Sequence, residues 1–289
     1  MSDHSIPGDR LEAAFGGLAE ESRVRILRAL WEMDEPSASF SELHDQTGIK
    51  DSGQFNYHLD KLRPGFVRKH NDGYALTYAG KQVIGAAVAG TYTDTDVTVD
   101  TIEIRECWHC GGTFGLRYDR GYLIVECLDC DAMLINGLPA PPVIAANYES
   151  EELLEVFNQI LLKHLQTMNR GFCILCGGVT EKSIVRDMEP AWASENHLHT
   201  RIECHSCGKE SYSVVGVEVM DHPVVIEFLF DHGIDIRNTP IWENDWLGEP
   251  HAEVTQENPL RIQTVVELEG DRLELVLDES LDVIDYDRE

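Results

Sequence analysis

The sequence lacks long apolar runs: none of its 289 residues belongs to a stretch of about 18 consecutive apolar residues, which a membrane-spanning helix requires. Its first ten residues also lack the apolar stretch of a secretory signal. We therefore expect a cytoplasmic protein without a membrane partner, in a compartment where thiols stay reduced. Hydrophobic residues make up 43% of the chain, which is enough for folded cores in two or three domains.

Basic charge is scarce, because 23 Lys and Arg face 52 Asp and Glu, giving a net charge of −29. Acidic residues are spread along the chain and lysine is rare, which indicates a halophilic protein whose carboxylates keep its surface hydrated. An acidic protein from an ordinary cytoplasm is the alternative. Residues 1–90 carry 10 Lys and Arg against 13 Asp and Glu, so almost all of the excess lies beyond them. We expect any contact with a polyanion to involve these first 90 residues.

Apolar periodicity in the first 90 residues predicts several helices. The segment 17–32 has an apolar helical face made of Leu18, Val24, Ile26, Leu27, Leu30 and Trp31. A short helix over 40–46 follows, capped by Ser39 or Ser41, and Gly48 permits a tight turn at 47–49. A third helix then runs from Asp51 or Ser52 to about Leu62. Two helices joined by a short turn indicate a helix-turn-helix.

The third helix has two distinct faces. Phe55, Leu59 and Leu62 form a narrow stripe that we expect to face the core. We expect the opposite side to contact base edges and phosphates in a DNA major groove, although an ordinary solvated face is the alternative. Its candidate DNA-binding residues are Lys50, Ser52, Gln54, Asn56, Tyr57 and Lys61. His58 lies at the edge of the core stripe, where a packed, hydrogen-bonded histidine is expected instead of a ligand.

Residues 66–77 predict a β-hairpin with Asp72-Gly73 in its turn. A hairpin that directly follows a recognition helix is a wing, and Arg68 and Lys69 lie on its first strand, next to His70. We add Arg68 and Lys69 to the candidate DNA-binding residues. An amphipathic helix from Tyr78 to about Ala89 completes the predicted domain.

The first 90 residues resemble the ArsR-type winged-helix regulators. The similarity is carried by Glu21-Ser-Arg-Val-Arg-Ile-Leu27, Tyr57-His-Leu-x-x-Leu62 and Asp72-Gly-Tyr74, within residues 9–90. The resemblance implies that the third helix enters the major groove and that a dimer binds a palindromic operator. Metal-sensing members carry cysteines on the helix before the turn, but residues 40–46 contain none. Sensing of toxic metals at that position is therefore not expected.

All eight cysteines lie in four Cys-x-x-Cys pairs, which we call knuckles: Cys107 and Cys110, Cys127 and Cys130, Cys173 and Cys176, Cys204 and Cys207. Sixteen residues separate the first two knuckles and 27 separate the second two, and a β-hairpin can bridge either span. The first hairpin is expected around 119–121, and 198–203 is expected to be the returning strand of the second. Glycine follows three knuckles, at positions 111, 177 and 208, which lets the backbone turn beneath a metal.

Four thiolates per site suit zinc or an iron–sulfur cluster, and hairpin-linked knuckles favour zinc. We expect two structural Zn²⁺ ions per chain, each contributing on the order of 10 kcal/mol to folding. A Cys₄ site is closed and has no position for a substrate water. His109 or His205 as a ligand, and a thiol switch that zinc release exposes, are the alternatives. The order in which the knuckles pair stays open.

The predicted fold class is α+β. The domains are a winged helix-turn-helix (1–90), a first zinc-ribbon-like module (91–147), a connecting or dimerisation helix (148–169), a second ribbon-like module (170–216) and an acidic C-terminal α/β region (217–289). The segments Cys-Trp-His-Cys-Gly-Gly112 and Cys-Ile-Leu-Cys-Gly-Gly178 indicate a divergent internal repeat.

Beyond the first ribbon, the helix 151–168 has one apolar side, made of Leu154, Phe157, Leu161, Leu165 and Met168. This side suits either a dimer seam or packing onto a ribbon. The C-terminal region predicts a short apolar helix over 224–232 and a hairpin of 261–268 with 272–277. Trp242 and Trp246 are expected to plug a small core, with a pocket lining as the alternative.

The order of a winged helix, paired knuckles and an acidic tail resembles regulators of halophilic archaea. We expect a transcriptional regulator that binds double-stranded DNA as a homodimer, with residues 91–289 responding to a protein or small-molecule effector. A zinc-stabilised protein-interaction adaptor, or a thiol or zinc redox sensor coupled to DNA binding, are the alternatives. The sequence has no nucleophile–base pair, phosphate loop or open metal site, so no enzyme is expected.

Overall fold

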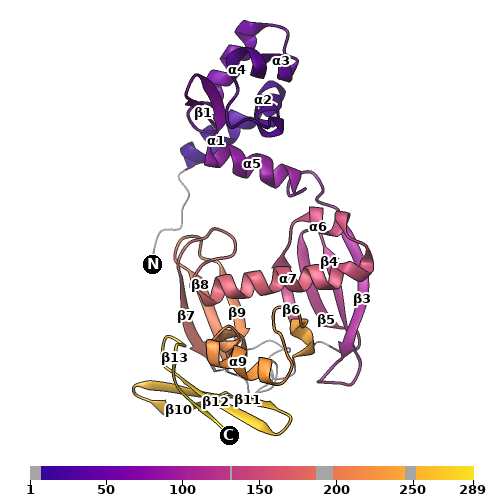
Figure 1. Ribbon diagram of the computed structural model, residues 1–289, viewed down its shortest axis with the longest axis vertical. Helices are drawn as coiled ribbons and strands as arrows, with labels where there is room; N and C mark the ends of the chain where they lie inside the picture. Colours follow the sequence, from indigo (N-terminus) through magenta and orange to yellow (C-terminus); the bar gives the residue numbers. More distant parts are fainter. Residues whose placement is uncertain (1–7, 131, 187–197, 245–251) are drawn as a thin grey trace. The chain divides into compact units, whose positions relative to one another are not determined.

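The computed structural model describes residues 8–130, 132–186, 198–244 and 252–289. The chain divides into two compact units, one made of residues 5–95 with 141–143 and the other of 96–140 with 144–289 (Figure 1). We call them the N-terminal and the C-terminal unit. The described strands form four antiparallel sheets alongside the helices, which confirms a mixed α+β fold.

The N-terminal unit contains helices and one hairpin. Its elements are α1 (Gly8–Leu18), α2 (Glu21–Glu32), α3 (Phe40–Thr47), α4 (Ser52–Leu62), β1 (Val67–His70), β2 (Gly73–Leu76) and α5 (Tyr78–Val88). The elements from α2 onward match the sequence expectations within a few residues. Helix α1 was not expected from the sequence.

Capping explains where α3 and α4 begin. The Ser39 side chain accepts a hydrogen bond from the Glu42 backbone N–H, and the Glu42 carboxylate accepts one from the Ser39 N–H, forming a capping box. Gly48 ends α3 in the left-handed conformation at φ 66°. Asp51 then caps α4 by accepting a hydrogen bond from the Gln54 N–H at 2.7 Å.

The core of the N-terminal unit lies between α2, α3, α4, the hairpin and α5. Its buried residues include Ile26, Leu27, Leu30, Leu43, Phe55, Leu59, Leu62, Val67 and Ile84. The apolar face expected for residues 17–32 was only partly correct. Val24 and Trp31 are exposed on α2, because the core-facing stripe of this helix is narrower than its apolar composition indicates.

The hairpin β1–β2 is confirmed, but its turn is displaced from the expected one. His70 pairs with Gly73, so Asn71 and Asp72 are the turn residues, and Asn71 adopts a positive φ of 53°. Gly73 has a different role. A Cβ atom there would lie 2.6 Å from the Ala38 carbonyl oxygen, and Tyr74 forms an antiparallel bridge with Ala38. The glycine therefore lets the hairpin pair closely with the segment before α3.

The C-terminal unit holds three of the four sheets. Its strands are β3 (Thr98–Glu106), β4 (Thr113–Asp119), β5 (Tyr122–Cys127), β6 (Met133–Pro139), β7 (Thr180–Val185), β8 (His199–Cys204), β9 (Glu210–Val214), β10 (Glu253–Glu257), β11 (Leu260–Leu268), β12 (Asp271–Leu277) and β13 (Val283–Arg288). Its helices are α7 (Ser150–Asn169), α8 (Val215–Val219), α9 (Pro223–Asp231) and the 3₁₀ turn η1 (Ile241–Glu243), and α6 (Pro142–Asn147) precedes α7. Each sheet is a meander in sequence order.

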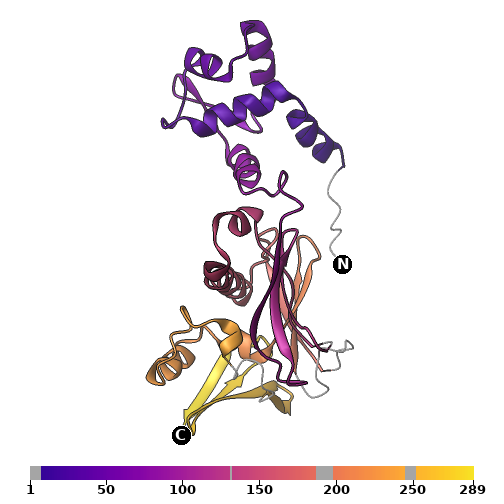
Figure 2. The same ribbon diagram turned by 90° about the vertical axis from the view of Figure 1, so that its right-hand side faces the viewer.

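Helix α7 lies against one face of both the β3–β6 and the β7–β9 sheet, as the two ribbon views show (Figures 1 and 2). Its apolar side is buried through Phe157, Leu161, Leu165 and Met168, and Phe157 stacks on Tyr118 with ring centroids 5.9 Å apart. Burial within the chain accounts for the apolar side of this helix without a dimer seam. The expected modules at 91–147 and 170–216 thus share one core through the connecting helix.

The C-terminal hairpin is confirmed, because β11 pairs with β12 around a turn of Glu269 and Gly270. The adjoining strands β10 and β13 extend it to a four-stranded sheet whose buried side belongs to the core of this unit. Trp242 is 4% exposed within that core, which agrees with an aromatic plug. Trp246 lies outside the described residues.

Candidate metal centres and nucleic-acid interface

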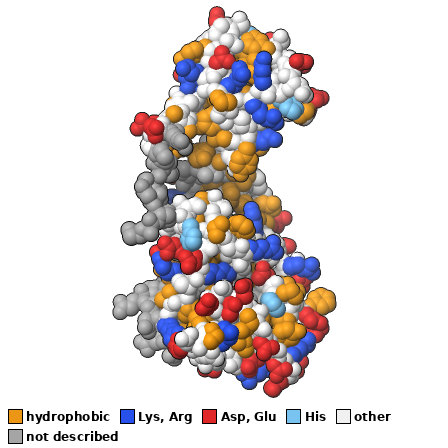
Figure 3. All heavy atoms as spheres, turned by 90° about the vertical axis from the view of Figure 1, so that its left-hand side faces the viewer, with side chains coloured by type: hydrophobic (Ala, Val, Ile, Leu, Met, Phe, Trp, Pro, Cys, Tyr) orange, Lys and Arg blue, Asp and Glu red, His pale blue; other side chains and the backbone are white. Residues whose placement is uncertain are grey.

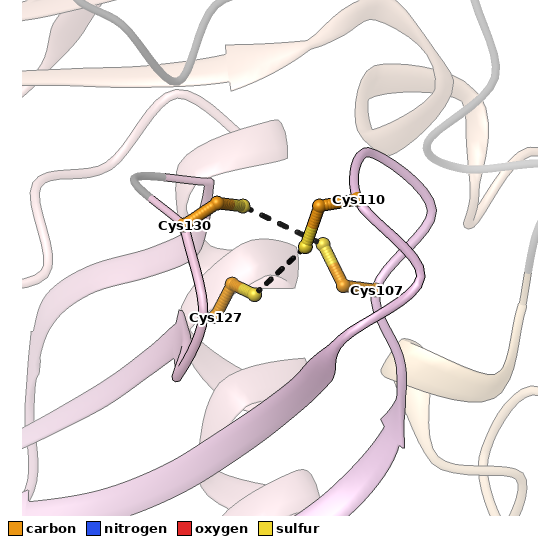
Figure 4. A group of neighbouring side chains, drawn as sticks. All are labelled: Cys107, Cys110, Cys127 and Cys130. Atoms are coloured by element: carbon orange, nitrogen blue, oxygen red, sulfur yellow. Dashed lines mark hydrogen bonds between the residues drawn. The ribbon is translucent and has the colours of Figure 1, made fainter.

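The first two knuckles form one cluster. Cys107 and Cys110 lie in the loop after β3, Cys127 ends β5, and Cys130 lies in the loop that follows (Figure 4). Their four Sγ atoms point toward a common centre and lie within 4.8 Å of one another. The hairpin β4–β5 sets this arrangement, because it returns the chain to the level of the first knuckle.

The third and fourth knuckles form a second cluster of the same kind. The Sγ atoms of Cys173, Cys176, Cys204 and Cys207 also lie within 4.8 Å of one another. The strands β7 and β8 pair in register from Thr180 opposite Cys204, which brings the two knuckles together. The knuckles therefore pair in sequence order, first with second and third with fourth.

The sulfur geometry fits a metal ion and not a disulfide. Sγ–Sγ separations are 3.9 Å for Cys107–Cys130 and 3.6 Å for Cys110–Cys127, and 3.8 Å and 3.5 Å for the corresponding pairs of the second cluster. A tetrahedral ion at about 2.3 Å from each thiolate requires sulfurs about 3.8 Å apart. A disulfide requires about 2.05 Å. Both sets of four cysteines can therefore hold a metal ion, and neither set includes a histidine.

The expected glycine turns are present behind three knuckles. Gly111, Gly177 and Gly208 have φ of 73°, 70° and 68°, in the left-handed region that glycine adopts without strain. The turns direct amides at sulfur, since the N–H groups of Gly112 and Gly178 donate to Cys110 Sγ and Cys176 Sγ at 3.3 and 3.4 Å. These donors stabilise thiolates in the geometry a metal needs.

The expected internal repeat extends from the sequence to the hydrogen bonds. Leu128 N–H donates to the Thr113 carbonyl at 2.8 Å, and His205 N–H donates to the Val179 carbonyl at 3.0 Å in the equivalent place. In each module the glycine after the first knuckle packs against the second. A Cβ atom would lie 2.3 Å from the Asp129 carboxylate at Gly112 and 2.5 Å from Ser206 Oγ at Gly178. We name β4–β6 the first module and β7–β9 the second module, each with its cysteine cluster.

One thiol in each cluster is poised to ionise. Burial raises the pKa of Cys127, but the Asp129 backbone N–H and the neighbouring thiols outweigh it and bring the pKa down to about 7. In the second cluster, burial raises the pKa of Cys204, but hydrogen bonds outweigh this effect and lower the pKa to about 6. The donors are the backbone N–H groups of Cys207 and Ser206 and the thiols of Cys176 and Cys207. Metal ligation requires the thiolate form, so each cluster presents a first ligand near neutral pH.

Three of the candidate residues on α4 form one exposed stripe. Gln54, Tyr57 and Lys61 lie at spacings of three and four residues, and Lys61 Nζ lies 5.5 Å from the centroid of the Tyr57 ring. The residues Lys50, Ser52 and Asn56 are exposed as well. The core-facing side of α4 is formed by Phe55, Leu59 and Leu62, which are at most 1% exposed and pack in the core. Carboxylates border this surface, because Asp51 caps the helix and Asp60 accepts a hydrogen bond from Asn56.

The hairpin separates its two candidate cations. Arg68 and Lys69 are both exposed, but adjacent residues of a strand face opposite sides. Arg68 shares its side with His70, whose Nδ1 lies 3.3 Å from Arg68 Nη1. The hairpin therefore presents one of the two cations to either side of itself.

Two groups of polar residues differ from the sequence expectations. His58 is packed as expected, but its buried Nδ1 has no hydrogen-bond partner within the described part of the chain. Lys182, whose side chain is 14% exposed, forms an ion pair with the fully buried Glu218 that the sequence did not indicate. No sequence signal could have found the pair, because charged residues are almost always exposed and the two lie 36 positions apart.

Comparison with known proteins places this geometry in a family. Residues 105–283 match a domain of unknown function, DUF7351, over more than half of the chain. The chain belongs to the DUF7351 family. Residues 11–87 match a second domain of unknown function, DUF7347. No curated protein and no solved structure matches the chain.

The DUF7351 match contains both cysteine clusters, α7 and most of the C-terminal sheet. The DUF7347 match contains α2 to α4 and the hairpin. The boundary between the two matches falls where the chain passes from the N-terminal to the C-terminal unit. Among the described residues, no helix is long and apolar enough to cross a membrane.

Proposed function

We propose that this DUF7351 protein is a DNA-binding transcriptional regulator of the winged helix-turn-helix type. In this proposal a homodimer reads promoter DNA with α4 and the hairpin β1–β2, and the C-terminal unit responds to an effector. Each cysteine cluster binds one structural Zn²⁺ ion, which gives two ions per chain. The ArsR-type resemblance of residues 9–90 is the starting point of the proposal.

The proposal rests on one observation. Gln54, Tyr57 and Lys61 form a single exposed stripe on α4, and the buried residues Phe55, Leu59 and Leu62 hold the other side of this helix in the core. The amide pairs with adenine edges, the ammonium with guanine edges or phosphates, and the phenol with phosphates or methyl groups. The tight turn at Gly48 and the hairpin after α4 supply the surroundings that such a helix has in groove-binding proteins.

The charge distribution agrees with a DNA contact in the N-terminal unit. Figure 3 shows several Lys and Arg side chains over one face of that unit, and Asp and Glu side chains mixed with Lys and Arg over the C-terminal unit. Beyond residue 90 the chain has 13 Lys and Arg against 39 Asp and Glu. The N-terminal unit is nevertheless not basic overall, so counterion release drives its binding weakly. Shape fit, direct base contacts and a few local cations then supply most of the affinity.

The test is selection of bound fragments from sheared genomic DNA by the zinc-loaded full chain, followed by binding measurements on the enriched sequence. Replacing Gln54, Tyr57 and Lys61 by alanine should weaken binding at least about a hundredfold, since each base contact is worth about 1–3 kcal/mol. The control Lys81→Ala removes an exposed cation from α5 and should change the affinity less than about threefold. Unchanged affinity of the triple variant would contradict the proposal.

Salt provides a second, independent readout. A regulator adapted to molar salt should bind the enriched DNA with a shallow or inverted dependence on KCl. Binding that collapses between about 50 mM and about 200 mM KCl would mean that phosphate contacts dominate, contrary to the proposal.

Metal identity is tested by elemental analysis of the purified full chain. Zinc at two equivalents per chain is expected, since both clusters are closed sets of four thiols. Iron with visible absorbance, or one equivalent of zinc, would contradict the assignment.

A protein-interaction adaptor is the second candidate, and exposed apolar residues at the knuckles favour it. Trp108 and Leu128 in the first module, and Leu175 in the second, are about half exposed. In this case Trp108→Ser with Leu128→Ser should abolish capture of a protein partner. The triple variant of α4 should leave promoter occupancy intact.

A further inference from the structure

The two modules have the same strand register but different inner faces. Antiparallel partners point to the same side of a sheet, so the pairing defines equivalent positions. Phe114 pairs with Cys127 as Thr180 pairs with Cys204, and Leu116 pairs with Val125 as Lys182 pairs with Ile202. The inner face of the first module comprises Phe114, Leu116, Tyr118, Leu123 and Val125, all at most 1% exposed. Its counterparts in the second module are Thr180, Lys182, Ile184, Thr200 and Ile202.

Three of the five inner positions are therefore polar in the second module. The Lys182 ammonium lies 2.5 Å from Glu218 Oε2, and Ser213 Oγ donates to Glu218 Oε1 at 2.6 Å. Lys182 Nζ also donates to the Asn169 carbonyl at 3.1 Å, at the end of α7. The Glu218 side chain is fully buried. These contacts tie β7 to α8 and α7 through charge where the first module uses apolar packing.

Some polar groups on the inner face of the second module have no hydrogen-bond partner. Thr180 Oγ1 and Thr200 Oγ1 are buried without a hydrogen-bond partner within the described part of the chain. A buried hydroxyl without a partner costs about 1–3 kcal/mol. The Lys182–Glu218 pair stabilises no better than apolar residues of the same volume, because the Glu218 carboxylate loses its hydration completely and the Lys182 ammonium loses most of it. The second module thus gains less stability from its own core than the first.

The cysteines of the second module are also more accessible. Cys176 and Cys207 are both exposed, whereas in the first cluster Cys110 alone is exposed and Cys130 is partly covered. A chelator or competing thiol therefore reaches two ligands of the second cluster and mainly one of the first.

We propose that the second cysteine cluster is the metal-responsive element of this chain, and that the second module keeps its fold only while a thiophilic divalent ion is bound there. The first module keeps its apolar inner face when its own ion is lost. Loss of the ion from the second cluster separates β7 from β8, breaks the Lys182–Glu218 pair and releases α8 from the sheet. This inference does not depend on DNA binding.

The experiment uses the full chain loaded with two equivalents of Zn²⁺ and a stepwise titration with a chelator. Released zinc is counted with a chromogenic indicator, and hydrogen exchange is followed by mass spectrometry in peptides from β4–β5 and β7–β8. We expect the first equivalent to leave at least about tenfold faster than the second, with β7–β8 losing protection while β4–β5 stays protected. Release of both equivalents in one step, or earlier loss of protection in β4–β5, would overturn the proposal.

A variant tests the stated cause. Lys182→Leu, Thr200→Leu and Glu218→Leu together give the second module an apolar inner face like that of the first, without leaving a buried charge unpaired. Zinc release from the second cluster should slow at least about tenfold. Ser183→Leu, on the exposed side of β7, is the control and should release zinc at the wild-type rate. If the triple variant also releases zinc at the wild-type rate while its fold is intact by circular dichroism, the proposal is wrong.

Discussion

Single glycines decide how closely the cysteine loops of each cluster pack. Gly112 and Gly178 occupy equivalent positions, and neither has a positive φ, so space and not backbone conformation requires glycine there. A Cβ atom at Gly178 would lie 2.5 Å from Ser206 Oγ and 2.7 Å from Ser206 Cβ. The near end of a side chain cannot rotate away, so the two knuckles would have to separate.

Gly178→Ala should therefore lower the free energy of unfolding by about 1–3 kcal/mol, as overpacking does elsewhere. Denaturant titration of the zinc-loaded chain measures it. Ser206→Gly in the same chain removes both short contacts and should restore at least half of the loss in a double-mutant cycle. Additive effects of the two changes would refute the steric explanation.

A histidine on α7 predicts a pH dependence. His164 Nε2 lies 2.9 Å from the Pro139 carbonyl, which can only accept, so Nε2 carries the proton. Burial lowers the pKa of His164 below its ordinary value of 6.5, although the bond to Pro139 opposes the shift. The unfolded chain then binds the proton more readily, and the stability contributed by neutral His164 is lost as the pH falls from about 6.5 through the lower folded pKa.

The pH effect is isolated by a variant. His164→Gln keeps a donor for Pro139 but does not titrate, so the stability difference between wild type and variant should shrink from about pH 7.5 to about pH 5. The cysteine clusters titrate alike in both proteins and cancel in this difference. A difference that stays constant or grows on acidification would contradict the shifted pKa.

At the scale of elements, the hairpin β1–β2 and helix α5 are held by a close backbone approach. Thr77 caps α5 by accepting from the Gly80 N–H, and its hydroxyl donates to the Gly65 carbonyl at 2.7 Å. A Cβ atom at Gly80 would lie 2.2 Å from the Phe66 carbonyl oxygen. This contact sets the position of the hairpin relative to the helix that follows it.

Gly80→Ala should destabilise the N-terminal unit by about 1–3 kcal/mol, although alanine favours a helix. Gly85→Ala on the same helix has only an ordinary contact with Trp31 at 3.9 Å and should stabilise by about 0.5–1 kcal/mol. Thermal unfolding of both variants measures the effects. Equal signs for the two substitutions would mean that the close approach does not matter.

Elements with a strong local pattern could be predicted from the sequence, and elements without one could not. The third helix was predicted because Phe55, Leu59 and Leu62 repeat at helical spacing, and the hairpin turns because glycine and acidic residues mark them. Helix α1 was missed because most of it is exposed, including Leu11 and Phe15, so it has no buried stripe. Strand β3 was missed for the same reason, since five of its nine residues are exposed and the other four are only partly buried.

The candidate sites divide in the same way. The cysteine clusters could be predicted because four Cys-x-x-Cys pairs, at spacings that a hairpin can bridge, are typical of metal ligands. The polar inner face of the second module could not, because it depends on register, and a lysine such as Lys182 is ordinarily a surface residue. A one-residue shift in pairing would have placed it outside.

At the scale of the whole molecule, charge differs sharply between the two units. Residues 1–90 have 10 Lys and Arg against 13 Asp and Glu, while the rest of the chain has 13 against 39. Carboxylates at this density repel one another. Salt screens the repulsion between charges that lie farther apart than the Debye length, which is about 10 Å at 0.1 M ionic strength and about 3 Å at 1 M.

The unfolding temperature of the C-terminal unit should therefore rise by at least about 5 °C between about 0.1 M and about 3 M KCl, and that of the N-terminal unit should change much less. Calorimetry of the zinc-loaded chain can follow the two transitions, assigned with Gly80→Ala, which lowers only the N-terminal one. A C-terminal transition insensitive to salt would mean that carboxylate repulsion is not a major term.

Genome-wide mapping of bound DNA in cells is the direct test of the proposal that the stripe Gln54, Tyr57 and Lys61 reads promoter DNA. Wild-type protein and the triple alanine variant are mapped in parallel, with Lys81→Ala as the control. We expect discrete promoter peaks that share one palindromic sequence, persist in the control and disappear in the triple variant at equal protein levels. Peaks that survive the triple substitution, or no enrichment of wild-type protein at any promoter, would contradict it.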